Sequence, residues 1–330
     1  MIRRALRDLL ARWRRPDPAT GVDAIAGLAE RLAVLLSAGV PASAVWVHVG
    51  GALGPPTPLA GETGDDELVL GAAAAAAAAG EPVSAAIVAA RGTAVRSTEQ
   101  WMVLAAAWEV ATESGAPLAS SLRELGGALR DEAQLRREVR SALAGPASSA
   151  RLVLALPLIA MLFGAAFGFD TPAVLLANPL GLGCLVAGVG LLWAGRRWSR
   201  SMVARATRSD ADRGLEAELV AIAMSGGASV DRARGLVRSA LRSSGTPSRD
   251  VRAVDDVIAV AARAGAPVAE LLRAEARRLR RAARAAGAAR AAALGVRLML
   301  PLGVCVLPAF VLLGVVPLVI SVVSGTLGAA

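Results

Sequence analysis

The sequence predicts an all-α membrane protein with two homologous cytosolic antiparallel helical bundles and three transmembrane helices. Of the 330 residues, 55% are hydrophobic and the mean hydropathy is +0.53. The apolar residues are concentrated in two blocks, 151–194 and 294–327. The remaining sequence is charged, has apolar residues at helical spacing, and repeats in its second half the motifs of its first half. These three observations are typical of a membrane protein with sizeable soluble parts.

Residues 1–21 are expected to form a basic amphipathic N-terminal segment. Ile2, Leu6 and Trp13 would share one face of a short helix, and arginines occupy the other faces. Such a helix can lie on an anionic leaflet, although a solvated helix start is an equally good interpretation. No uninterrupted apolar run follows, so we do not expect a signal peptide.

Residues 22–150 are predicted to be the first cytosolic helical domain. Glycine commonly ends a helix and proline commonly opens the next one, so Gly39–Pro41 and Gly115–Pro117 predict tight helix corners. Residues 50–98 contain a Gly/Pro-rich stretch and a poly-Ala run. We interpret them as a low-complexity insertion outside the shared core.

Residues 151–195 are predicted to form a transmembrane hairpin, and residues 294–330 a third transmembrane helix with an uncharged tail. Arginines flank the spans on one side, whereas the turn between the first two spans carries only Asp170. The positive-inside rule therefore predicts that residues 1–150 and 195–296 are cytosolic, with the N-terminus inside and the C-terminus outside.

Residues 196–293 are predicted to be a second cytosolic domain that duplicates the first. Arg31–Gly39 resembles Glu218–Gly226, and Ser114–Leu122 resembles Ala264–Leu272. Each half then continues into an Arg-rich stretch and an apolar segment. The repeat predicts two further helix corners, at Gly226 and at Gly265–Pro267.

The residue inventory offers little for catalysis. Every basic residue is Arg, so a P-loop Lys and Schiff-base chemistry are excluded. The single His, His48, has no acidic residue or Cys nearby in sequence, and Cys184 and Cys305 lie in apolar blocks as small hydrophobic residues. We therefore expect no catalytic, cofactor-binding or metal-binding residues and no enzymatic activity.

Other functions fit the sequence less well. The Arg-rich segment 273–290 lacks the aromatic residues that stack on bases and adjoins a predicted span, so membrane anchoring explains it better than nucleic-acid binding. The predicted spans contain no Asp, Glu, Arg or His, which disfavours a transporter. A membrane-tethered scaffold or signalling protein remains an alternative.

Motifs without chemistry of their own follow one another in a characteristic order. They are Leu35-Leu36-x-x-Gly39-x-Pro41, Trp108-Glu109, Ser114-Gly115-Ala116-Pro117-Leu118, Arg137-Glu138-Val139, Ala144-Gly145-Pro146, Leu156-Pro157, Asn178-Pro179-x-Gly181 and Ala264-Gly265-Ala266-Pro267. This order resembles the type II secretion system F family of inner-membrane platform proteins, and most closely its tight-adherence (Tad/Flp) pilus branch. The resemblance extends over roughly residues 22–325.

The resemblance implies a non-enzymatic, multi-pass platform in the bacterial cytoplasmic membrane that couples a hexameric assembly ATPase to the extraction of pilin-like subunits. It implies as partners the ATPase, pilin-like subunits, further copies of the chain and the lipid bilayer, without nucleic acid or cofactors. The candidate partner-binding residues lie on an exposed charged helix face. They are Arg123, Glu124, Arg136 and Arg137.

Overall fold

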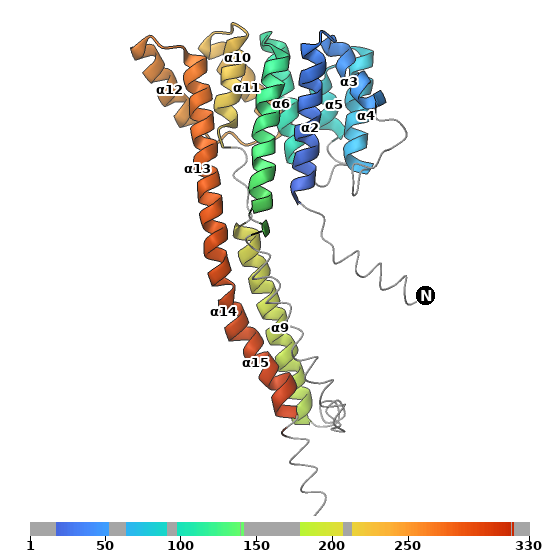
Figure 1. The fold of residues 1–330 in the computed structure, drawn as a ribbon, viewed down its shortest axis with the longest axis vertical. Helices are drawn as coiled ribbons and strands as arrows, with labels where there is room; N and C mark the ends of the chain where they lie inside the picture. Colours follow the sequence, from blue (N-terminus) through green and yellow to red (C-terminus); the bar gives the residue numbers. More distant parts are fainter. Residues whose placement is uncertain are drawn as a thin grey trace, which may run out of the picture. The chain divides into compact units, whose positions relative to one another are not determined.

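A computed structural model describes residues 18–52, 64–90, 98–138, 140–141, 179–206, 213–317 and 319. Every regular element in these ranges is a helix (Figure 1), which confirms the all-helical class for the described part of the chain. Residues 1–17 of the predicted basic segment 1–21 and the first predicted span, 152–169, lie outside these ranges. The layout of two bundles and three spans stays a prediction.

The chain divides into two compact units. The first contains Met1–Arg137 and Asp210–Arg284, and the second contains Glu138–Ser209 and Ala285–Ala330. Most of both predicted cytosolic domains therefore falls in the first unit.

The first unit contains two runs of helices. The first run is α2 (Pro18–Ser37), α3 (Ala42–Ala52), α4 (Gly64–Ala79), α5 (Val83–Ala90), α6 (Thr98–Ser114) and a helix over residues 118–138. The second run is α10 (Leu215–Ser225), α11 (Val230–Ser244), α12 (Val251–Ala264) and the first part of α13 (Val268–Arg297).

Three helix corners share one backbone geometry. Gly39, Gly115 and Gly265 have φ values of +90°, +72° and +63°, in the left-handed region that favours glycine. The amide after each glycine bonds back to the preceding helix, as when Ala116 N–H donates to the Ala111 carbonyl over 2.9 Å. The next helix then starts directly after a proline.

The fourth corner corrects the alignment of the repeat by one residue. Gly226 has φ −80°, whereas Gly227 has φ +89°. Gly227 is therefore the geometric counterpart of Gly39, and Ser225 becomes the counterpart of Ser37. Gly226 is required for a different reason, the close approach of its backbone to the end of α6. An added Cβ there would lie 2.3 Å from the Ser114 carbonyl oxygen.

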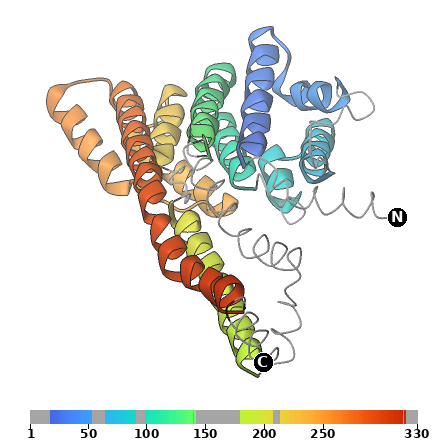
Figure 2. The ribbon, with the colours of Figure 1, turned by 60° about the horizontal axis from the view of Figure 1, so that its bottom comes forward.

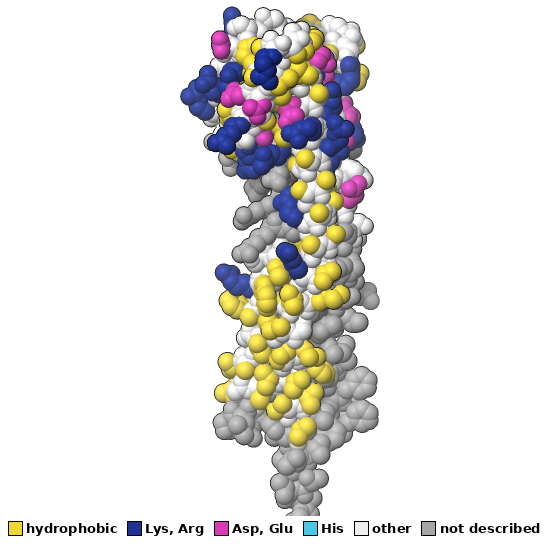
Figure 3. Space-filling view, turned by 90° about the vertical axis from the view of Figure 1, so that its left-hand side faces the viewer, with side chains coloured by type: hydrophobic (Ala, Val, Ile, Leu, Met, Phe, Trp, Pro, Cys, Tyr) yellow, Lys and Arg dark blue, Asp and Glu magenta, His cyan; other side chains and the backbone are white. Residues whose placement is uncertain are grey.

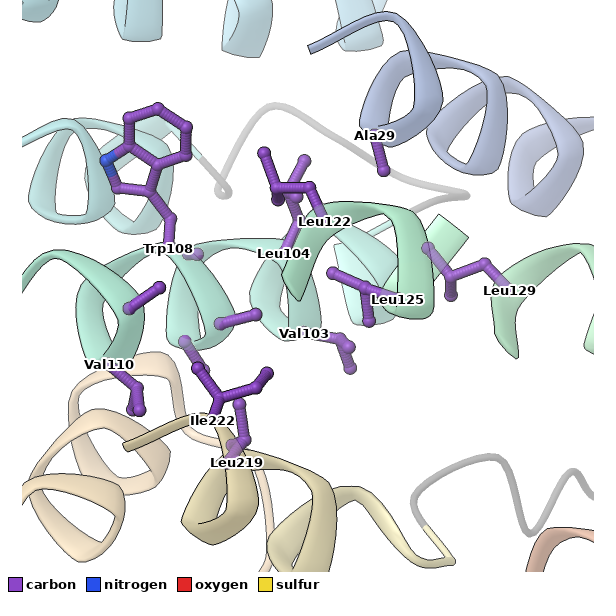
Figure 4. Packing of buried hydrophobic residues seen from close by; sticks show 14 of the residues in the cluster. Ala29, Val103, Leu104, Trp108, Val110, Leu122, Leu125, Leu129, Leu219 and Ile222 are labelled. Carbon is purple, nitrogen blue, oxygen red and sulfur yellow. The ribbon is translucent and has the colours of Figure 1, made fainter. Parts of the chain in front are cut away.

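Helix α6 lies at the centre of the first unit. It packs against α2 and α5 from its own half and against α10 and α11 from the second half. Figure 4 shows Val103 and Val110 pointing from α6 toward the second half, where Leu219 and Ile222 point back. A single hydrophobic cluster thus joins both halves.

Residues 64–90 are part of this core. Val69, Ala73 and Ile87 are fully buried in the cluster, and the indole N–H of Trp101 donates to an Asp66 oxygen over 2.8 Å. The prediction that the insertion lies outside the shared core is wrong for these residues. Alanine is the strongest helix former, and its small side chain allows helices to pack closely, so the poly-Ala run forms α4 against α3 and α5.

The second unit contains α9 (Pro179–Ala206) beside a broken apolar helix (Figure 2). The broken helix continues from the end of α13 through α14 (Met299–Pro301), η2 (Leu302–Val306), α15 (Leu307–Phe310) and η3 (Val311–Val315). Pro301 and Pro308 lack the amide hydrogen of a regular helix, which accounts for the π-helical turns η2 and η3. In the described residues one helix, Val268–Val315, is long and apolar enough to cross a membrane.

Candidate functional site

Two candidate partner-binding residues contact other helices of the first unit. Arg123 donates to the Ser37 hydroxyl of α2 over 2.8 Å. Glu124 lies 3.4 Å from Arg273 of α13. Both residues therefore help to hold the helix over residues 118–138 in place.

The other two candidates have intramolecular partners as well. Arg136 forms an ion pair with Glu132 on its own helix. Arg137 forms an ion pair with Asp23 of α2 and donates to the Gln134 side chain over 3.0 Å. Binding of a partner by any of the four residues stays a prediction.

The same ion pair occurs once in each half of the first unit. With Gly39 aligned on Gly227, Glu30 of α2 corresponds to Glu218 of α10. Arg130 pairs with Glu30, and its counterpart Arg280 lies 2.7 Å from Glu218. The pair joins the first and last helices of each half, but the Glu218 side chain is only 5% exposed, compared with 37% for Glu30.

A close helix crossing accompanies each ion pair. In the first half, a Cβ on Gly126 would lie 3.0 Å from Glu30 Cγ and 3.4 Å from the Ala26 carbonyl oxygen. In the second half, a Cβ on Gly214 would lie 2.6 Å from the Ala276 carbonyl oxygen. Ala26 corresponds to Gly214 and Gly126 to Ala276, so each crossing has one glycine, on opposite partners.

The pKa values of three carboxyl groups near these crossings are shifted in different directions. Burial raises the pKa of Glu124 above its usual value of 4.5; Arg273 opposes this shift and neighbouring Glu218 adds to it. The hydrogen bond from Arg130 lowers the pKa of Glu30. Arg278 likewise lowers the pKa of Glu275 on α13.

A buried polar network fixes the start of α10 against the start of α12. The Gly214 amide donates to Asp250 over 2.5 Å. Ser248 and the Asp250 amide both donate to Glu216, over 2.6 and 3.2 Å. Both carboxylates are thus satisfied by backbone or hydroxyl donors, which makes this network structural.

No cluster of His, Cys, Asp or Glu in the described residues has the arrangement of a metal site. His48 is exposed on α3. Cys184 is half-buried on α9, and Cys305 is buried in η2, both as free thiols. The described residues therefore bring no nucleophile, base and acid together.

Two glycines bring α9 close to the broken apolar helix. A Cβ on Gly188 would lie 2.4 Å from Leu313 Cγ, and a Cβ on Gly195 would lie 3.0 Å from Cys305 Cβ. Small residues of this kind allow membrane helices to approach closely.

The outer surface of this helix pair is apolar. In Figure 3, mostly hydrophobic side chains gather over this unit, whereas charged side chains gather over the first unit. The exposed apolar residues include Leu182, Val186, Val189 and Trp193 of α9, and Val304, Leu307, Val311 and Val315 of the broken helix. Such a surface suits lipid tails or other membrane helices.

The described residues form an all-helical protein with one helix long and apolar enough to cross a membrane. The family model described as type II secretion system (T2SS), protein F matches residues 28–166 and 228–316, more than half of the chain. The chain belongs to the type II secretion system protein F family. Proteins of this family are non-catalytic inner-membrane platform components of secretion and pilus-assembly machinery. No curated protein and no solved structure matches the chain.

Sequence reasoning missed the residues that hold the two halves in the same geometry. Aligning Ser37 with Ser225 would have placed Glu30 opposite Glu218 and Ala26 opposite Gly214. The spacing of Gly188 and Gly195, two helical turns apart, was a signal for a close helix contact.

Proposed function

We propose that this chain is the inner-membrane platform of a type II secretion or Tad/Flp pilus machine. In this role it couples a hexameric cytosolic ATPase to the extraction of pilin-like subunits from the membrane. The observation that carries the proposal is the family match, which extends over both halves of the chain and into the apolar helix.

The first unit supports a role in transmitting force rather than in chemistry. Its two halves share one hydrophobic cluster through α6. Because packed cores transmit strain, a force applied to one half would act on the other half through this cluster. Helix α13 begins in this unit and continues into the second unit at Ala285. A movement of the cytosolic helices would therefore act on the membrane segment through continuous helix.

The proposal assigns one partner to each unit. The ATPase would bind the charged first unit from the cytosol, and pilin helices would bind the apolar surface of the second unit. The proposed topology is multi-pass, with residues 22–150 and 196–293 in the cytosol and the C-terminus outside.

Gene deletion with complementation tests the platform role. Deletion is expected to abolish the pilus or the secreted product while the partner ATPase keeps its activity in vitro, and the wild-type gene restores assembly. Normal assembly without the gene and without a paralogue contradicts the proposal. A C-terminal reporter that is active only in the cytosol contradicts the topology alone.

A further inference from the structure

Helices α6 and α12 occupy the same position in the two halves but are covered differently. Aligning Gly115 with Gly265 pairs them residue for residue. Most of α6 is buried, whereas in α12, which is fully described, only Val254 and Ala261 are buried. The difference arises because α5 of the first half and α10 and α11 of the second half all pack against α6. No described helix covers the face of α12 that corresponds to the α10-facing side of α6.

The face of α12 that corresponds to the α10-facing side of α6 has an apolar residue at its centre. Val110 points from α6 toward the second half (Figure 4), and its counterpart on α12 is Val260. Val260 is 47% exposed. Val103, the other α6 residue in this contact, corresponds to Ala253, which is half-buried.

The face of α2 that corresponds to the α6-facing side of α10 is exposed. Ile222 and Leu219 of α10 point toward α6 (Figure 4), and their counterparts on α2 are Val34 and Arg31. Val34 is 63% exposed, and Arg31 is exposed as well. The chain thus carries, on α12 and on α2, counterparts of the two sides of its internal α6–α10 contact.

We propose that α12 of one copy binds α2 of a second copy, head to tail, in the way that α6 binds α10 within the chain. The two surfaces differ, so the contact is heterologous and leaves a free α2 face and a free α12 face on every dimer. A heterologous contact continues until it closes into a ring or extends as a chain.

Charge complementarity favours the contact of α12 with α2 over a two-fold symmetric contact of α12 with α12. Asp256 on the α12 face is exposed and corresponds to Ala106, while Arg31 on the α2 face corresponds to Leu219. A head-to-tail contact brings one acidic and one basic side chain together. A two-fold contact of α12 with α12 would instead bring two Asp256 residues together.

At the helix corner, the proposed contact between α12 and α2 is looser than the contact between α6 and α10 within the chain. Gly226 allows the corner after α10 to approach the Ser114 carbonyl, but its counterpart in α2 is Ala38, whose Cβ prevents an approach this close. The intermolecular contact therefore centres on Val34 and Val260.

Cysteine crosslinking of full-length protein in native membranes tests the proposal. In a background with Cys184→Ala and Cys305→Ala, differently tagged Val34→Cys and Val260→Cys chains are co-expressed and mildly oxidised. We expect a crosslinked dimer that carries both tags, and no dimer from either variant alone. Val251→Cys is the matched control, because nine residues at about 100° each place it on the opposite side of α12 from Val260.

Three results would overturn the proposal: a dimer from Val260→Cys alone, equal crosslinking through Val251→Cys, or no crosslink between Val34→Cys and Val260→Cys. Charge exchange adds a second readout. Arg31→Asp in the Val34→Cys chain or Asp256→Arg in the Val260→Cys chain should lower the crosslink yield several-fold, and the two changes together, one in each chain, should restore it. Neither readout requires the ATPase or a pilin, so the inference stands or falls independently of the platform role.

Discussion

Glu30 and Glu218 bind corresponding arginines in different surroundings. The Glu30–Arg130 pair is exposed to water, which screens the charges and competes for their hydrogen bonds. Glu218 is buried, and Arg280 is largely buried beside it. Removal of one partner there leaves the other charge without compensation in a poorly solvated place.

Glu218→Gln should therefore destabilise the protein much more than Glu30→Gln. We expect Glu218→Gln to lower the free energy of unfolding by about 2 kcal/mol, because Arg280 keeps some access to water. Glu30→Gln should leave the unfolding midpoint nearly unchanged. Chemical denaturation of the full chain in detergent, followed by circular dichroism, measures both variants. Equal effects would contradict this account of the repeated pair.

Glu124 should make stability depend on pH in a specific direction. Its pKa is raised by burial, so between 4.5 and the raised value the folded state binds more protons than the unfolded state. Its contribution to stability is present below pH 4.5 and is lost as the pH rises through the raised pKa. Glu124→Gln should be at least as stable as wild type at pH 7, and this advantage should shrink toward pH 4.5.

Glu275→Gln is the matched control for this pH effect. The pKa of Glu275 is lowered by Arg278, so its stabilising contribution is present above pH 4.5 and is lost as the pH falls through the lowered value. The two variants should therefore differ from wild type with opposite signs at pH 7. Unfolding midpoints at several pH values between about 4 and 8 compare them, and shifts of the same sign would refute the assignment.

At the scale of helices, sequence patterns indicated where helices begin and end better than they indicated which helices pack together. Only a few residues tolerate positive φ, so glycine followed by proline is a specific local signal. The signal became ambiguous at Gly226-Gly227, where either glycine could end the helix, and the repeat was aligned one residue off. The α4–α5 segment was misjudged because composition alone does not show which alanines face a core.

Gly188 should be intolerant of larger side chains, whereas Gly190 should accept them. Valine at position 188 would overlap Leu313, and overpacking of this kind costs about 1–3 kcal/mol. At Gly190 an added Cβ meets nothing within 4 Å. Thermal unfolding in detergent should show a lower midpoint for Gly188→Val only. Leu313→Ala should partly restore it, and failure of this rescue would argue against a direct contact between α9 and η3.

For the whole molecule, the hydropathy blocks and periodicity predicted the helical class and the apolar helix. They could not predict that both halves would pack around α6, because contacts between segments distant in sequence leave no periodic signal. The intramolecular contacts of the candidate site could not be predicted either, and its binding of a partner stays a prediction. Arg123, Glu124, Arg136 and Arg137 looked free on one helix, but their partners lie on that helix and on helices distant in sequence.

Because residues 64–90 contribute to the hydrophobic cluster that joins both halves, Ile87→Ala should destabilise the entire first unit. Ile87 is fully buried, so the expected loss is about 3 kcal/mol. Leu68→Ala on α4 is the control, because Leu68 is exposed and should have little effect. Hydrogen exchange should show faster exchange in α10 and α11 as well as in α5 for Ile87→Ala. Faster exchange confined to α4 and α5 would mean that this segment is peripheral after all.

The two close crossings have different consequences for how the halves could diverge after a duplication. At Gly214 an added Cβ would lie 2.6 Å from the carbonyl oxygen of residue 276, a backbone atom that is present whatever side chain that residue carries. At Gly126 the added Cβ would instead lie 3.0 Å from Glu30 Cγ, which belongs to a side chain that can rotate away, and in ordinary contact with the Ala26 carbonyl oxygen at 3.4 Å. Sequence change is therefore more tightly restricted at position 214, where φ is also +78°, than at position 126.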